Sequence, residues 1–166
     1  MGVYYGENHP FNACGRVNSR SQTAYRAELR ALAHVVNTAT EPTWMVTDCK
    51  SAALQLAKMI RARDAGEEVV LPSSNSDIWA AIHAAISAAR PGYFQVTWTK
   101  AHLTGEAAEK AIREGKTTAE AVRRNDNVDT LAKAGAALHG IPEERVHVAK
   151  LKARLAAAVQ GMFVAQ

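Results

Sequence analysis

Apolar side chains recur at helical spacing in the first half of the chain. The first stripe ends near residue 37 and comprises Tyr25, Leu29, Leu32 and Val36. Residues 51–63, which are rich in Ala, Leu and Met, predict a second helix. Residues 77–89 predict a third helix, and Ile78, Ile82 and Ile86 share one of its faces. Ser76 is expected to cap this third helix, and Pro91-Gly92 is expected to end it.

Short runs of strand-forming residues separate these helices. Residues 2–5 and 11–17 predict a hairpin, and residues 43–47 predict a strand that follows Pro42. Residues 93–99 alternate, which predicts a half-buried strand with Phe94, Val96 and Trp98 on one face. With strands placed between helices in this order, the pattern predicts an α/β fold in which helices pack on a mixed sheet.

Charged residues and helical spacing dominate the remainder of the chain. Residues 104–124 form an insertion in which Thr117-Thr-Ala-Glu120 resembles a capping box, so helical turns are expected there. Asn125 is expected to cap a helix that runs to Leu138 and holds Asp129 in its first turn. The inward face of that helix is expected to carry Val128, Leu131, Ala132, Gly135 and Leu138.

We expect one domain over residues 1–140, followed by an amphipathic C-terminal helix or linker over residues 141–166. The chain has 166 residues, of which 48% are hydrophobic, and this length suits a single core. Two alternatives stay open for the C-terminal segment: it packs back on its own sheet, or it docks on another domain or a second copy.

The overall charge and the cysteines restrict function only loosely. A net charge of +4 fits a polyanionic partner, but scattered Lys and Arg residues give the same total. Cys14 and Cys49 lack metal-ligand spacing with His and are interpreted as free thiols, which is typical of a reducing, intracellular compartment. No run of about 18 apolar residues is present, so no membrane association is expected.

Acidic side chains and one histidine stand at the edges of the predicted elements. Asp48 ends a predicted strand, Glu28 lies beside the first helical stripe, and His102 follows another strand. Such sheets collect their sites at the carboxyl ends of strands, and carboxylates supply the hard oxygen ligands of divalent metals. Taken singly, Asp48 could cap a helix, Asp129 could favour a helix dipole, and Glu28 or His102 could have no chemical role.

Four fragments carry these residues in a fixed order. They are Arg26-Ala-Glu28-Leu, Thr47-Asp48, Trp98-Thr-Lys-Ala-His102 and Asn125-x-x-x-Asp129-x-Leu-Ala132. In this order, and with these flanking residues, residues 2–138 resemble the ribonuclease H family. The resemblance is to the ribonuclease H domains of retroelement reverse-transcriptase polyproteins.

The resemblance implies a five-stranded mixed sheet flanked by helices and endonucleolytic hydrolysis of the RNA strand of an RNA/DNA hybrid. It implies that Glu28, Asp48 and Asp129 are catalytic ligands of Mg²⁺ or Mn²⁺. It also implies that His102 assists proton transfer or product departure, and that Gln22 and Asn125 contact the substrate. Enzymes of this kind recognise duplex shape and 2′-hydroxyl groups more than base sequence.

The chain departs from the family pattern in its first strand, which in relatives carries an Asp that bridges both metals. Residues 2–5 match the second strand, and Glu7 falls in the hairpin turn. We therefore expect the first strand to be missing or supplied elsewhere, with impaired catalysis in its absence. The rest of a reverse-transcriptase polyprotein is one candidate source. Three interpretations remain: a ribonuclease H, an inactive structural or nucleic-acid-binding module of a larger assembly, and a related DNA-cutting nuclease.

Overall fold

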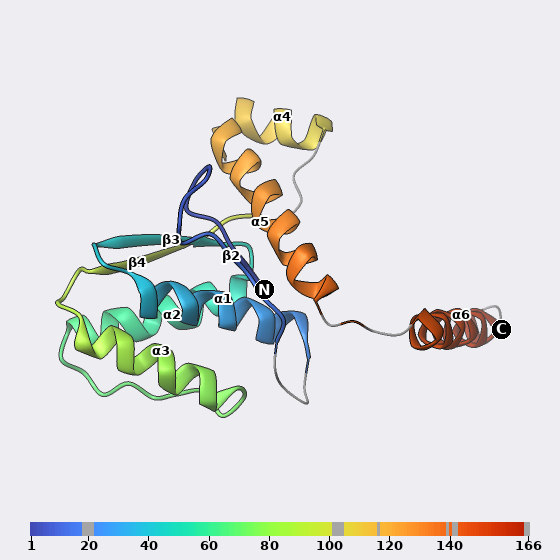
Figure 1. Ribbon diagram of the computed structural model, residues 1–166, viewed down its shortest axis with the longest axis horizontal. Helices are drawn as coiled ribbons and strands as arrows, with labels where there is room; N and C mark the ends of the chain where they lie inside the picture. The colour runs from blue at the N-terminus through green and yellow to red at the C-terminus, as the bar shows by residue number, and fades with distance from the viewer. Residues whose placement is uncertain (18–21, 101–104, 116, 139, 141–142, 165–166) are drawn as a thin grey trace.

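The computed structural model describes residues 1–17, 22–100, 105–115, 117–138, 140 and 143–164 (Figure 1). The strands are β1 (Gly2–Val3), β2 (Ala13–Cys14), β3 (Thr43–Thr47) and β4 (Phe94–Trp98). The helices are α1 (Ala24–Thr38), α2 (Lys50–Asp64), α3 (Ser76–Ala88), α4 (Gly105–Arg113), α5 (Ala119–Ala137) and α6 (Glu143–Val164). This mixed α/β arrangement confirms the predicted fold class.

The described strands form two separate ladders. β1 pairs antiparallel with β2, and β3 pairs parallel with β4, with Thr43 opposite Phe94 and Thr47 opposite Trp98. A parallel pair needs a long crossover connection, which α2 and α3 provide here. The five-stranded sheet implied by the resemblance is not seen in the described residues, because no strand among them pairs with both β1 and β3.

The core lies between the β3–β4 ladder and the helices α1, α2 and α3, which gather on one side of it in Figure 1. Leu29, Leu32 and Val36 are buried there, and Tyr25 packs against them half-buried, which confirms the predicted stripe of α1. Met45 and Phe94 contribute the inward face of the ladder. The alternating pattern of β3 therefore separates a buried face from an exposed one.

Three predicted details are wrong. α3 is preceded by Asn75, which has a left-handed backbone (φ 55°) and makes no side-chain capping bond, so Ser76 is the first helical residue instead of the cap. Trp98 is 42% exposed although it belongs to the inward face of β4. Leu138 is 55% exposed because α5 ends just before it, at Ala137.

The helix that carries Asp129 begins earlier than expected. Thr118 is its N-cap, and the Thr118 hydroxyl accepts a hydrogen bond from the Ala121 N–H (3.1 Å). Glu120 pairs with Arg123 and Arg124 one turn further on, and pairs at this spacing favour helix over loop. Asn125 and Asp129 therefore lie inside α5, instead of at its cap and in its first turn. The predicted helical turns of the insertion are confirmed by α4.

Two glycines let α5 approach the β1–β2 ladder at backbone distance. A Cβ atom on Gly2 would lie 2.6 Å from both the Ala132 nitrogen and the Val128 oxygen of α5. A Cβ atom on Gly135 would lie 2.7 Å from backbone atoms of Gly15 and Met1. Since these distances are shorter than any real Cβ contact, only glycine fits at both positions. The two glycines therefore set how closely α5, and with it Asp129, approaches the ladder.

Replacing Gly135 by Ala is expected to lower the free energy of unfolding by about 1–3 kcal/mol, the usual cost of overpacking. In a solvated helix the same change would instead stabilise by up to about 1 kcal/mol, because Ala is the better helix former. Urea unfolding measures the sign. Gly6→Ala is the matched control, since nothing lies within 4 Å of a Cβ at Gly6. Stabilisation by Gly135→Ala would contradict the close approach.

The C-terminal helix α6 lies apart from the other elements in Figure 1. Its described residues from Glu144 to Leu155 are all exposed. Among the described helices, α6 included, none is both long enough and apolar enough to cross a membrane. The cysteines Cys14 and Cys49 are both free.

Candidate active site

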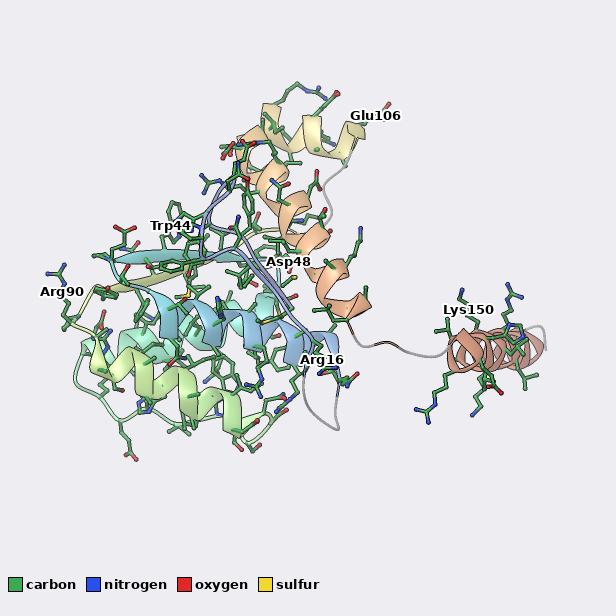
Figure 2. The ribbon with its side chains drawn as sticks, viewed as in Figure 1. Arg16, Trp44, Asp48, Arg90, Glu106 and Lys150 are labelled. Carbon is green, nitrogen blue, oxygen red and sulfur yellow. The ribbon has the colours of Figure 1, made fainter. Side chains whose placement is uncertain are left out.

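Three elements bring three carboxylates toward one region of the molecule. Glu28 lies in the second turn of α1, Asp48 directly follows β3, and Asp129 lies in the middle of α5. Figure 2 marks Asp48 just beyond the end of β3. All three side chains are half-buried. Because α1 contacts both β1 and β3 while α5 packs on β1, the three acids share this edge of the fold.

The charges of Asp48 and Asp129 act on the carboxyl group of Glu28. Burial raises the pKa of Glu28 most, the charges of Asp48 and Asp129 raise the pKa further, and the Met1 amine opposes the shift. Like charges raise a pKa in this way only when they lie close together or are poorly screened. The region therefore concentrates negative charge that a bound cation would neutralise.

Asp48 occupies a turn that is held by its neighbours. The Thr47 hydroxyl accepts a hydrogen bond from the Cys49 N–H (3.2 Å), and the Trp98 indole N–H donates to the Asp48 carbonyl oxygen (3.0 Å). The Lys50 ammonium lies 5.3 Å from the centre of the Trp98 ring. These contacts join the ends of β3 and β4 and fix the backbone from which the Asp48 carboxylate projects.

The simplest structural roles do not account for Asp48 and Asp129. The N-cap of α2 is Cys49, and no side chain makes a capping bond there, so Asp48 is not the cap of that helix. Asp129 lies far beyond the first turn of α5, where a helix dipole favours acids. Neither acid is placed by the needs of helix formation.

The oxygen donors on α1, β3 and α5 fit a divalent metal by chemistry, because carboxylates are the ligands that Mg²⁺ and Mn²⁺ prefer. Their spacing is looser than in a finished site. Among the His, Cys, Asp and Glu side chains that the structure describes, no group of three is close enough to hold one ion. The carboxylates of Glu28, Asp48 and Asp129 therefore suit a divalent metal by chemistry, but among the described side chains they do not by themselves surround an ion.

Replacing Glu28 by Gln is expected to stabilise the chain at neutral pH by about 0.5–2 kcal/mol, because it removes a negative charge that burial and the neighbouring acids disfavour. A raised pKa in the folded state means that Glu28 supports folding below about pH 4.5, its unperturbed value, and loses that contribution as the pH rises through the folded pKa. Thermal unfolding at pH 3 and pH 7 measures the effect. Equal effects at both pH values would contradict the assigned charge repulsion.

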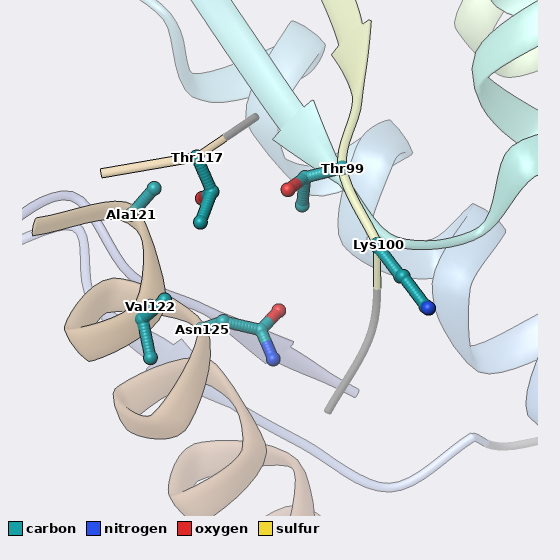
Figure 3. Close-up of a pocket in the computed structure, with 6 residues that line it drawn as sticks. All are labelled: Thr99, Lys100, Thr117, Ala121, Val122 and Asn125. Carbon is teal, nitrogen blue, oxygen red and sulfur yellow. The ribbon is translucent and has the colours of Figure 1, made fainter. Parts of the chain in front are cut away.

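The remaining predicted site residues are Asn125, Gln22 and His102. Asn125 is half-buried and lines a small cavity of about 10 Å³ between α5 and the end of β4. Figure 3 shows its amide directed across that cavity toward the chain near Thr99. Gln22 is exposed and directly precedes Thr23, the N-cap of α1. His102 lies outside the described residues.

A second hollow was not anticipated from the sequence. It is an open groove of about 560 Å³ between the starts of α1 and α3, lined by Thr23, Tyr25, Arg26, Ser74, Asn75, Ser76 and Asp77. The buried Arg26 guanidinium binds the Asp77 carboxylate with both terminal nitrogens and donates to the Asn75 side-chain oxygen (2.8 Å). The only feature of the sequence that could have pointed to this groove was Arg26, which lies two residues before Glu28.

Comparison with known proteins gives a family match. The family model described as RNase H matches residues 1–137, most of the chain and all three acids. No curated protein and no solved structure matches the chain. The elements from β1 to α5 and the residues Glu28, Asp48 and Asp129 fall within the matched residues, and α6 lies beyond them. The chain belongs to the RNase H family.

Proposed function

We propose that this chain is the nuclease domain of a retroelement polyprotein, which hydrolyses the RNA strand of RNA/DNA hybrids with Mg²⁺ or Mn²⁺. The observation that carries the proposal is that the charges of Asp48 and Asp129, beside burial, raise the pKa of Glu28, within an RNase H family match. In this proposal, three acids from three separate elements would meet beside the carboxyl end of β3, where α/β folds commonly place their sites.

Each residue has a defined task in this proposal. Glu28, Asp48 and Asp129 would hold the metal, which when bound activates water and stabilises the departing oxygen. His102 would move a proton at the leaving oxygen or help the product to depart. An N-terminal strand with an Asp would complete the ligand set, and activity is expected to be weak without it.

Substrate contacts would extend from the acids along the starts of α1 and α3. Hydroxyl and amide groups at Thr23, Ser74 and Asn75 line the groove there, and such groups commonly bind phosphate oxygens and sugars. Gln22 precedes this groove, and Asn125 lies near the end of β4. Contacts to sugar and phosphate suit an enzyme that recognises duplex shape.

One specific observation favours a second function. No three of the described acids lie close enough together to hold an ion. In that case the chain would be an inactive RNase H-like module that supplies structure or nucleic-acid binding to a larger assembly. The proposals differ in whether Glu28, Asp48 and Asp129 bind metal.

Titration calorimetry with Mn²⁺ separates the two functions. A nuclease site is expected to bind Mn²⁺, and Asp129→Asn is expected to weaken that affinity by at least about tenfold, as losses around metal sites commonly do. Glu68→Gln is the control, because Glu68 is an exposed acid on the loop after α2. Heats that are the same for Asp129→Asn and the parent chain would favour the inactive module.

A further inference from the structure

The helix α6 carries an apolar stripe that the rest of the described chain leaves in solvent. Val148, Leu151 and Leu155 are 43%, 49% and 67% exposed. Residues three and four apart lie on the same face of a helix, so these three side chains fall within an arc of roughly 60°. Such a narrow stripe is typical of a seam between two helices.

Basic residues border this stripe on both sides. By helical geometry Arg145 and Lys152 lie along one flank, and Arg154 lies along the other beside His147, which is neutral in the charge count at pH 7. Figure 2 shows Lys150 projecting from α6 into solvent. Glu144 stands in the first turn of α6, where an acid favours the helix dipole, and it lies in line with the stripe one turn before Val148.

This charge pattern discriminates between occupants of the seam. In a pair of identical helices, parallel or antiparallel, the positions that flank the seam of one helix lie against those of the other. In two copies of α6, basic side chains would therefore lie against basic side chains. A second copy is therefore disfavoured. A nucleic acid would use the basic side chains but not the apolar seam. Acids flanking an apolar seam on the partner would satisfy both features.

We propose that α6 is a docking helix for an acidic amphipathic helix of a partner protein, with Val148, Leu151 and Leu155 in the seam. The flanking bases set the choice of partner, since charges beside a helical seam determine which helices pair. This interaction is independent of the nuclease proposal, because none of its residues belongs to the group of acids.

The test uses the full chain and two designed helical peptides that share a leucine seam, one flanked by Glu and one flanked by Lys. Fluorescence anisotropy is expected to show at least about tenfold tighter binding of the Glu peptide. Changing Leu151 and Leu155 together to Ala is expected to weaken that binding by at least about tenfold, while helix content by circular dichroism is kept. Ala149→Gln, on the opposite side of α6, is the matched control.

A charge reversal provides the second measurement. The double change Lys152→Glu and Arg154→Glu is expected to shift the preference toward the Lys peptide. Equal affinity for the two peptides in the parent chain, or no binding of the Glu peptide, would overturn the proposal. It would equally be overturned by self-association that the Leu151 and Leu155 changes abolish, or by tighter binding to phosphatidylserine vesicles or to an RNA/DNA hybrid than to the Glu peptide.

Discussion

Replacing Asp48 by Asn is expected to lower the rate of RNA cleavage in an RNA/DNA hybrid by about a thousandfold, which corresponds to about 4 kcal/mol of lost transition-state stabilisation. The measurement uses the chain extended at its N-terminus by an Asp-bearing strand. The change removes a negative oxygen at the end of β3 but keeps the shape of the side chain. The turn that holds Asp48 is made by the Thr47 hydroxyl, the Trp98 indole and the Asp48 backbone, so the fold is expected to survive.

Glu68→Gln in the same extended chain is the control and is expected to leave the rate unchanged, because it removes an exposed acid outside the site. Melting temperatures of both variants verify that they are folded. Undiminished cleavage by Asp48→Asn would remove Asp48 from the active site and with it the proposed metal geometry.

Replacing Trp79 by Ala is expected to cost about 3–5 kcal/mol of stability, the largest effect of any single change considered for the fold. Trp79 is completely buried in α3, within the core formed by α1, α2 and α3. Truncation leaves a cavity that the surrounding Leu and Ile side chains can fill only in part. Chemical denaturation followed by circular dichroism measures the loss.

Trp44→Ala is the matched control for Trp79, because it removes the same side chain from the outer face of β3, where it is 67% exposed. The Trp44 indole donates to the Thr97 hydroxyl (2.8 Å), but this contact lies in solvent, so a change of about 0.5 kcal/mol or less is expected. If the two variants lost equal stability, the assignment of the core to one side of the β3–β4 ladder would be wrong.

The sequence predicted those elements whose burial pattern is simple. α1 buries Leu29, Leu32 and Val36 in one continuous stripe, and β3 alternates between buried and exposed positions. In these segments the positions that the local pattern predicts to be buried are also the positions that pack in the core. The α/β class and the family resemblance could therefore be inferred from the sequence before any coordinates.

The sequence did not predict features that depend on contacts between distant segments. The start of α5 was misplaced because Asn125 is a good cap in isolation, whereas Thr118 makes the actual capping bond. Gly2 and Gly135 are required only because α5 packs against the β1–β2 ladder, and a local sequence pattern does not predict this packing. The grouping of Glu28, Asp48 and Asp129 was suggested by resemblance, but their spacing came from packing.

Cleavage of a matched set of substrates by the extended chain tests the central claim most directly. The set contains an RNA/DNA hybrid, duplex RNA and duplex DNA of one sequence, each with Mg²⁺ and with a chelator. The account predicts internal cuts in the RNA strand of the hybrid that require Mg²⁺, with little cleavage of either duplex. Preferential cutting of duplex DNA, or hybrid cleavage that persists in chelator, would contradict it.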